Sequence, residues 1–198
     1  MKFSYDLPII HNGVFVYDLD INEDFIPYFE SLKFENQNED QVKLSINKNV
    51  LNNLPNLKTE IYNALHHLVS DVLLSKQIDI NIYHSWVTQT GINAESHPHK
   101  HANAWFSGVF YPEEDPSFGL RIFNDNLSIF QPEHKAYGIY NSYQFELKPK
   151  KNQLFIFFST LRHQVMKNKS NKYRYSLAFN ALPKGSFGSH DSTFNFKE

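Results

Sequence analysis

Residues 97–111, HPHKHANAWFSGVFY, carry the strongest pattern in this sequence. Three of the ten histidines fall within these first five residues, at the alternating positions 97, 99 and 101. On an extended backbone such side chains share one face, so an adjacent pair could bind one metal ion. One strand cannot easily place all three on a single ion, so a further ligand is expected from elsewhere. The apolar run 105–111 predicts a β-strand directly after the histidines.

Short apolar segments separated by turn residues surround this stretch. Ile78, Ile80 and Ile82 alternate with polar residues, as in a strand with one buried face. Further strands are predicted at 105–111, 120–123, 138–140, 143–147, 154–158 and 173–180. Before residue 78 the apolar residues recur at helical spacing, over 25–32 and 57–72. Two helices followed by many short strands predict a mainly β protein with N-terminal helices, an antiparallel sandwich or barrel.

Length and composition limit the domain organisation and the classes of function. We expect one domain over 1–198, with 1–77 as helical N-terminal support, 78–188 as a β core and 189–198 as a tail. The net charge of −2 argues against a protein that holds nucleic acid by bulk charge. The absence of cysteine excludes disulfides, thiolate metal sites and cysteine nucleophiles. No apolar run predicts a secretory signal or a membrane span, so we expect a soluble, cytoplasmic protein.

His163 is the natural candidate for the further ligand. It stands 62 residues after His101 and follows the predicted strand 154–158. Imidazole suits iron, zinc, copper and nickel, and three facial ligands with open positions are typical of oxygen-activating iron(II) sites. The alternative interpretation is an exposed, histidine-rich turn without a metal.

The segment 173–180 predicts an anion-binding strand. Its alternation places Tyr173, Tyr175, Leu177 and Phe179 on one face, and Arg174 and Ser176 on the other. A guanidinium beside a hydroxyl is a suitable receptor for a carboxylate, because the planar fork can bind both oxygens. The alternative is an arginine paired with a carboxylate of its own chain.

Taken in order, these motifs resemble the iron(II)- and 2-oxoglutarate-dependent oxygenases, and in particular a small group of bacterial and phage members. The matching stretches are His99-Lys-His101, WFSGVFY (105–111), GLRIF (119–123), FFSTLRH (157–163) and RYSLAFN (174–180). The resemblance spans about Ile82 to Gly188, a little over half of the chain.

The resemblance implies a double-stranded β-helix, that is, a jelly-roll or cupin-like barrel. It implies iron(II) held by His99, His101 and His163, and 2-oxoglutarate whose distal carboxylate binds Arg174 with help from Ser176. Asn103, on the face of His101, could hydrogen-bond a bound acid. With O2 as the oxidant we expect hydroxylation of an unidentified small molecule or protein, with no catalytic side chain beyond the metal ligands.

Two points stay open in the sequence. Most of the superfamily has a carboxylate where His101 stands, and the nearest carboxylates, Glu95 and Asp125, lack the family spacing. His97 is an alternative ligand, as in a cupin-type three-histidine metalloprotein that uses no 2-oxoglutarate. A non-catalytic ligand-binding barrel is the other alternative. The sequence indicates no oligomeric state.

Overall fold

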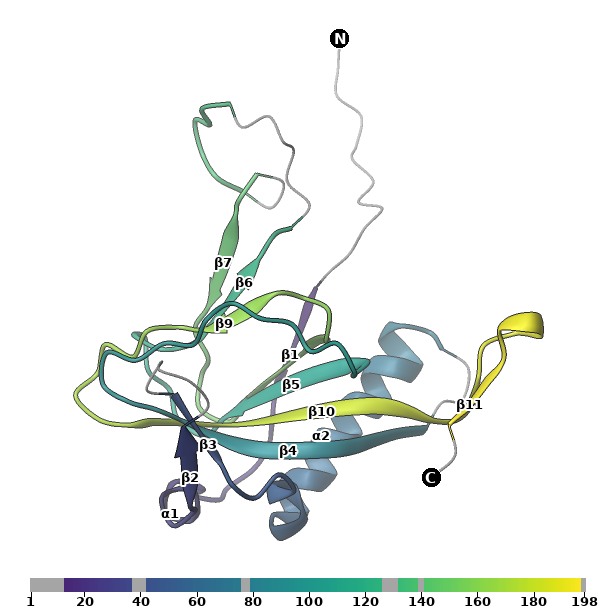
Figure 1. Ribbon diagram of the computed structural model, residues 1–198, viewed down its shortest axis with the longest axis horizontal. Coiled ribbons are helices and arrows are strands. Elements are labelled where there is room, and N and C mark those ends of the chain that lie inside the picture. Colours follow the sequence, from purple (N-terminus) through teal and green to yellow (C-terminus); the bar gives the residue numbers. More distant parts are fainter. Residues whose placement is uncertain (1–12, 37–41, 76–78, 126–131, 139–140, 197–198) are drawn as a thin grey trace.

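Two antiparallel sheets face each other in the computed structural model, which describes residues 13–36, 42–75, 79–125, 132–138 and 141–196 (Figure 1). The larger sheet contains, in spatial order, β1 (Val14–Asp18), β8 (Gln153–Phe158), β5 (Phe106–Tyr111), β10 (Arg174–Phe187), β4 (Asp79–Thr90), β3 (Val42–Ser45) and β2 (Phe34–Asn36). A final strand, β11 (Phe194–Phe196), pairs with the distal part of β10. The smaller sheet has the order β7 (Gln144–Leu147), β6 (Leu120–Phe123) and β9 (His163–Val165).

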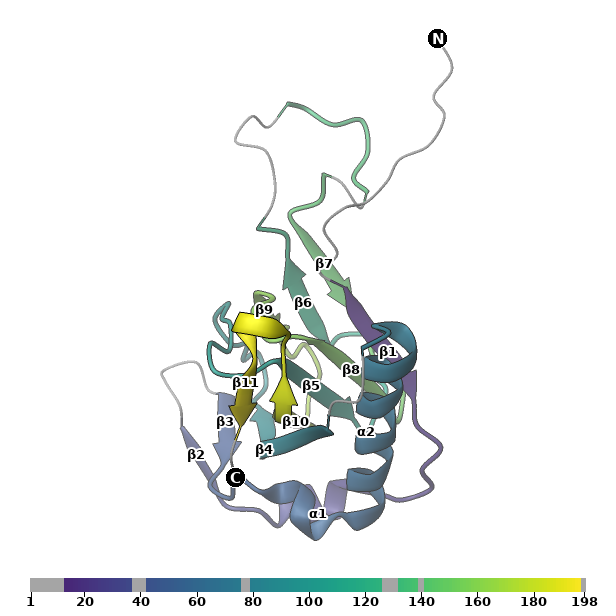
Figure 2. The same cartoon turned by 90° about the vertical axis from the view of Figure 1, so that its right-hand side faces the viewer.

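Helices cover the outer face of the larger sheet. The main one, α2 (Pro55–His67), begins with Pro55 in its first turn, where a missing N–H costs nothing, and continues as a π-helical turn over Leu68–Val72. A one-turn helix α1 (Ile26–Glu30), the 3-10 turn Val50–Asn53 and a second 3-10 turn at His190–Ser192 complete the described helices. Figure 1 shows α2 behind β10 and β4, and Figure 2, turned by 90°, shows α2 along one side of the sheet.

The apolar stripe of α2 packs against the sheet and forms the main core. Leu57, Ile61 and Leu65 are fully buried there against residues of β5, β8 and β10. Phe179 of β10 lies over Gly108 of β5, where an added Cβ would sit 2.2 Å from the Phe179 ring. Glycine in the Ser-Gly pair of 105–111 is therefore required by close packing of the sheet on its helix side.

The strand β8 is apolar almost throughout because both of its faces are covered. Leu154 and Ile156 belong to the core under α2, whereas Phe155 and Phe157 belong to a second cluster between the two sheets. That second cluster also contains Leu120 of β6. A strand covered on both sides shows a continuous apolar run and loses the alternation of a half-exposed strand.

The predicted strands at 105–111, 120–123, 143–147 and 154–158 agree with β5, β6, β7 and β8 to within a residue or so. The strand predicted at 173–180 is longer, since β10 continues to Phe187, and 138–140 falls mainly outside the described residues. None of the helices within the described ranges is long and apolar enough to cross a membrane.

The N-terminal third differs from the expected helical support. It supplies three strands to the larger sheet, where β1 pairs with β8 and β3 pairs with both β2 and β4. The expected tail also joins the sheet, through the pairing of β11 with β10. These strands are three to five residues long, and β1 and β3 pair with strands far away in the chain, so local periodicity gave no signal for them.

Candidate metal centre

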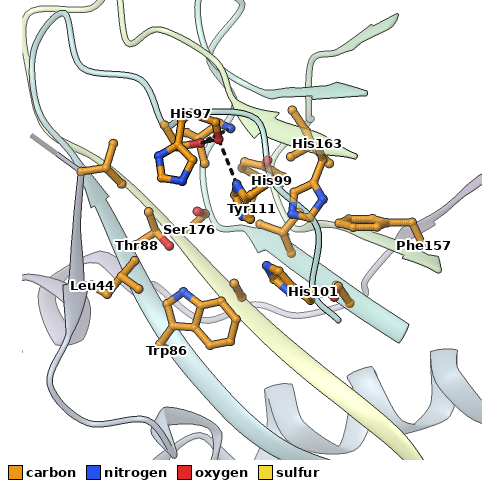
Figure 3. A pocket seen from close by; sticks show the side chains of 18 residues that line it. Leu44, Trp86, Thr88, His97, His99, His101, Tyr111, Phe157, His163 and Ser176 are labelled. Atoms are coloured by element: carbon orange, nitrogen blue, oxygen red, sulfur yellow. Dashed lines mark hydrogen bonds between the residues drawn. The ribbon is translucent and has the colours of Figure 1, made fainter. Parts of the chain in front are cut away.

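A cavity of about 320 Å³ lies between the two sheets (Figure 3). Strands β3, β4, β5, β8 and β10 of the larger sheet form one side, and β6 and β9 of the smaller sheet form the other. Four histidines line it, namely His97, His99, His101 and His163. Within the described part of the chain its lining contains no Asp, Glu, Lys or Arg side chain.

Backbone pairing brings three of these histidines together. His99 and His163 form an antiparallel bridge, in which the N–H of each donates to the carbonyl oxygen of the other at 2.9 Å. The His101 N–H donates to the Ser159 carbonyl, also at 2.9 Å. One ring nitrogen from each of His99, His101 and His163 lies within 4.8 Å of the other two, so the three could hold one metal ion. The histidine-rich segment is thus extended, as predicted, and lies against the segment that carries His163.

Each of the three rings is oriented by a hydrogen bond at Nδ1. The Nδ1–H of His99 donates to the His97 carbonyl at 2.9 Å, and that of His163 donates to the Leu161 carbonyl at 2.8 Å. His101 Nδ1 lies 2.7 Å from the side-chain oxygen of Asn180. A proton on Nδ1 leaves Nε2 as the free lone pair, which is how metal-binding histidines are usually held.

Burial keeps these imidazoles uncharged. Desolvation lowers the pKa of His99 and of His101, and it lowers the pKa of His163 to about 3. Positive charge on the neighbouring histidines would lower the pKa of His163 further, whereas its bond to Leu161 opposes this. Neutral imidazole is the form that binds a metal, so the cluster needs no deprotonation near neutral pH.

The carboxylates nearest in sequence do not join this cluster. A Glu95 oxygen accepts a bond from the Gln164 side chain at 3.3 Å. Asp125 pairs with Lys100 and Arg162 on the outside. Among the described residues, the group that could hold a metal ion consists of three imidazoles only.

His97 and Asn103 have other surroundings. His97 lines the cavity, and its carbonyl orients His99, but it is not one of the three clustered histidines. Asn103 is exposed, and its carbonyl accepts a bond from the Tyr83 hydroxyl at 2.7 Å. A turn over residues 102–103 interrupts the alternation that was expected to carry Asn103 onto the face of His101. The expectation that Asn103 contacts a bound acid therefore finds no support in this arrangement.

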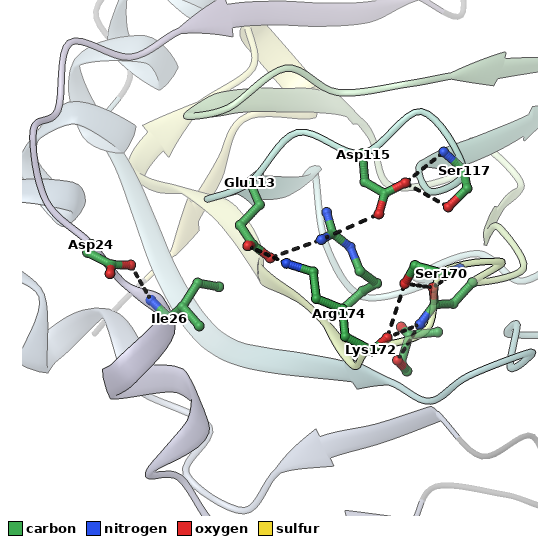
Figure 4. A network of polar contacts seen from close by, with 10 residues as sticks. Asp24, Ile26, Glu113, Asp115, Ser117, Ser170, Lys172 and Arg174 are labelled. Carbon is green, nitrogen blue, oxygen red and sulfur yellow. Dashed lines mark hydrogen bonds and ion pairs between the residues drawn. The ribbon is translucent and has the colours of Figure 1, made fainter.

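The guanidinium of Arg174 is buried and held by two carboxylates (Figure 4). Its Nη1 lies 3.0 Å from Glu113 Oε2 and 3.5 Å from Asp115 Oδ2. Glu113 also pairs with Lys172 at 2.8 Å. This is the own-chain pairing that the sequence left open as an alternative. Both carboxylates contact the same nitrogen, however, and the buried Nε has no hydrogen-bond partner within the described structure.

Asp115 is firmly held in its ionised form. The backbone N–H and the hydroxyl of Ser117 both donate to it, at 2.8 and 2.6 Å. Burial would raise the pKa of Asp115, but these bonds and the charges of Arg174 and Lys172 outweigh burial and lower it. The four charged groups Glu113, Asp115, Lys172 and Arg174 balance, so Arg174 is compensated in the ligand-free protein.

The Ser176 side chain faces the cavity. Ser176 of β10 pairs across the sheet with Thr88 of β4, and both line the cavity. Two residues before Ser176 on β10, Arg174 lies opposite Thr90 of β4. The buried Thr90 hydroxyl, like Arg174 Nε, lacks a hydrogen-bond partner in the described structure. Directly opposed residues share a face. Two unpartnered polar atoms, Arg174 Nε and Thr90 Oγ1, therefore belong to the same face of the sheet as Ser176.

Sequence reasoning missed several residues of this site. Trp86 and Thr88 alternate along β4, and Ser107, Val109 and Tyr111 alternate along β5, so each set presents one face to the cavity. The Ser107 hydroxyl lies 2.9 Å from His101 Nδ1. Burial raises the pKa of Tyr111, which keeps its phenol neutral. Period-two alternation could have found these side chains, but which face of each strand is lined needs the fold.

The part of the chain that carries this site matches a known protein family. Residues 84–180 match the family described as "Putative 2OG-Fe(II) oxygenase". The chain belongs to the 2-oxoglutarate- and iron(II)-dependent oxygenases. The match contains the three clustered histidines and also Arg174 and Ser176. Iron(II) and 2-oxoglutarate are the cofactor and co-substrate of this oxygenase family, and O2 is its oxidant.

Solved structures agree on the fold. HygX from Streptomyces hygroscopicus, with nickel, 2-oxoglutarate and hygromycin B bound, has a TM-score of 0.64 at 8% identity, over 87% of this chain and 83% of that one. The epimerase SnoN from nogalamycin biosynthesis has a TM-score of 0.64 at 10% sequence identity, over 86% of this chain and 78% of that one. A prolyl hydroxylase from Trichoplax adhaerens has a TM-score of 0.61 at 11% sequence identity, over 86% of this chain and 84% of that one. The search of curated proteins found no match to this chain's sequence. The predicted double-stranded β-helix is confirmed.

The residues of this oxygenase fit both groups that the family uses. Three neutral, oriented imidazoles suit iron(II), although the set lacks the carboxylate found in most of the superfamily. On β10, the unpartnered buried Nε of Arg174 and the hydroxyl of the cavity residue Ser176 are suitable donors for a carboxylate.

Proposed function

We propose that His99, His101 and His163 hold the iron(II) of this oxygenase through their Nε2 atoms. Their proximity within 4.8 Å and the occupied Nδ1 positions support this set. His97 stays outside it and orients His99 through its carbonyl. Because all three ligands are neutral, the metal keeps its full positive charge, which favours binding of an anionic co-substrate beside it.

We also propose that the distal carboxylate of 2-oxoglutarate binds Arg174 and Ser176. The observation that carries this assignment is the buried Arg174 Nε without a partner, on the face that Ser176 presents to the cavity. Glu113 and Asp115 contact only Nη1, so a carboxylate could approach Nε. Tyr111 lies in the same cavity as a neutral phenol and adds a further hydrogen-bonding group.

The reaction converts 2-oxoglutarate, O2 and a substrate C–H bond into succinate, CO2 and a hydroxylated product. Iron(II) with 2-oxoglutarate supplies the oxidising chemistry when both are bound. The chain's own residues bind and orient these groups, and they exclude water. Val109, Leu120 and Phe157 line the cavity and provide the apolar environment for that purpose.

We infer that the substrate presents an uncharged, apolar group to the iron. The side of the cavity formed by β3 and β4 carries Val42, Leu44 and Trp86, and the Trp86 ring lies 6.0 Å from that of His101 (Figure 3). A charged group entering there would lose its hydration without gaining a counter-ion. The small net charge of −2 supports a small molecule or a protein segment rather than nucleic acid.

Anaerobic titration tests the assignment directly. Iron(II) is added to the purified protein with 2-oxoglutarate, and the weak visible charge-transfer band of the chelate is followed. We expect the band, and we expect succinate to form from 2-oxoglutarate once O2 is admitted. Iron binding without a band would contradict the 2-oxoglutarate site while leaving the metal site intact.

A further inference from the structure

A single carboxylate outside the cavity joins the two segments that carry the three histidines. Asp125 follows the end of β6, and one of its oxygens lies 2.8 Å from Lys100 Nζ. The other oxygen lies 2.7 Å from both Nε and Nη2 of Arg162. Each carboxylate oxygen thus has its own cationic partner.

These two cations are the sequence neighbours of the proposed ligands. Lys100 stands between His99 and His101, and Arg162 directly precedes His163. The β6 strand supports this arrangement, because the Phe123 N–H donates to the Arg162 carbonyl at 2.9 Å and the Arg162 guanidinium lies 4.4 Å from the Phe123 ring centre. Asp125 is therefore tied to both ligand segments from outside the cavity.

We propose that Asp125 is a positioning residue that holds the two ligand segments in place for metal binding. Its negative charge also favours binding of the metal cation. This inference rests on the proposed three-histidine iron site. Without Asp125 the two ligand segments keep their backbone hydrogen bonds but lose the side-chain ion pairs that join them, and Lys100 and Arg162 lose their shared counter-charge. Both consequences weaken metal binding. The ligand set contributes no negative charge, so a carboxylate just outside it matters more than it would beside an anionic ligand.

The same ion pairs contribute little to folding. Lys100, Arg162 and Asp125 are each more than a third exposed, and exposed pairs stabilise proteins only slightly. The expected signature of Asp125→Asn is therefore a large change in metal affinity with a small change in the unfolding temperature of the metal-free protein. A residue with a merely structural role would show the reverse.

Anaerobic titration of iron(II) alone, with a chromophoric chelator as competitor, tests this proposal. We expect Asp125→Asn to raise the Kd for iron(II) about tenfold and Asp125→Glu to restore part of the affinity. The matched control is Glu35→Gln, which breaks the exposed Glu35–Lys48 pair at 2.9 Å on the β2 side. The control should bind iron(II) as the wild type does.

Ionic strength gives an independent readout. Because these charges are exposed, added salt should screen them, and the difference in Kd between wild type and Asp125→Asn should shrink at high salt. Equal affinities of Asp125→Asn and wild type at low salt would overturn the role of Asp125 and leave the proposed function standing. Failure of the wild type to bind iron(II) would overturn the proposed metal site and this inference together.

Discussion

The site has two parts of opposite character. In the histidine end, three imidazoles converge in the cavity without any charge of their own. In the arginine end, a permanent charge, Arg174, is buried with its counter-ions already in place, two residues before the cavity residue Ser176 on β10. The histidines stay neutral because burial lowers their pKa values. The arginine cannot become neutral, so Glu113 and Asp115 compensate it.

The difference shows how the charge state of each end before binding affects the binding of its ligand. A cation can enter the histidine end without displacing any charge. A carboxylate that enters the arginine end joins a group whose charges already balance, so its binding depends on how much the two acidic neighbours oppose it. The histidine end therefore favours tight binding of a metal cation. At the arginine end, the affinity for a carboxylate depends on Glu113 and Asp115.

The largest expected effect breaks the histidine end. His163→Ala removes the most buried of the three proposed ligands and should abolish measurable iron(II) binding, as judged by anaerobic titration. His66→Ala on the exposed face of α2 is the matched control and should bind normally. Wild-type affinity in His163→Ala would mean that the metal lies elsewhere.

The second largest effect is expected from a substitution at the arginine end, which should weaken 2-oxoglutarate binding and leave iron(II) binding unchanged. Arg174→Gln should weaken 2-oxoglutarate binding about 10- to 100-fold, because a charge-assisted bond is lost, and should leave the iron(II) Kd within about twofold. The measurement is titration of 2-oxoglutarate into the iron(II)-loaded protein without O2. The double variant Arg174→Gln/Glu113→Gln controls for acidic groups left without their cation. Unchanged 2-oxoglutarate affinity in both variants would remove β10 from the co-substrate site.

A smaller effect sharpens the comparison. Glu113→Gln keeps a hydrogen-bond acceptor but removes one counter-charge, so 2-oxoglutarate should bind about three- to tenfold more tightly. The ligand-free protein should at the same time be less resistant to denaturant, since Arg174 loses part of its compensation. Weaker binding of 2-oxoglutarate would show instead that Glu113 positions the guanidinium.

The smallest effect is a dependence on pH that belongs to the histidine end. The pKa of His163 is about 3 in the folded protein and about 6.5 in an unfolded chain, so the folded state binds fewer protons. Its contribution to stability is complete above pH 6.5 and is lost as the pH falls toward 3.

The thermal midpoint of the metal-free protein measures this dependence. It should fall by on the order of 5 °C between pH 6.5 and 5, and by less in His163→Gln. The arginine end should contribute nothing in this window, because the pKa of Asp115 is lowered from an already acidic value. An equal fall in both proteins would assign the pH dependence to other groups.

Much of the site could be predicted from local pattern. Alternation places His99 with His101, and Arg174 with Ser176, because side chains two apart on extended backbone share a face. His163 was predicted from its position after the apolar run 154–158, and its backbone pairing with His99 agrees with that choice. The continuous apolar run 154–158 likewise predicted β8, which is covered on both faces.

Other features depended on contacts between distant parts of the chain. Glu113 meets Arg174 across 61 residues, and Asp125 meets Arg162 across 37. The strands β1 and β3 were missed because pairing with β8 and β4, rather than any pattern of their own, makes them part of the sheet. Asn103 was misplaced for the opposite reason, since a turn ended the alternation that local pattern assumed.

The sequence by itself determined which chemical groups are available and on which face of each strand they lie, because strand periodicity is a property of a few neighbouring residues. Only the tertiary structure decided which of those groups are held, compensated or left without a partner. Hydrogen bonds and ion pairs act over a few ångströms in space, and packing alone brings residues from distant parts of the chain within that reach.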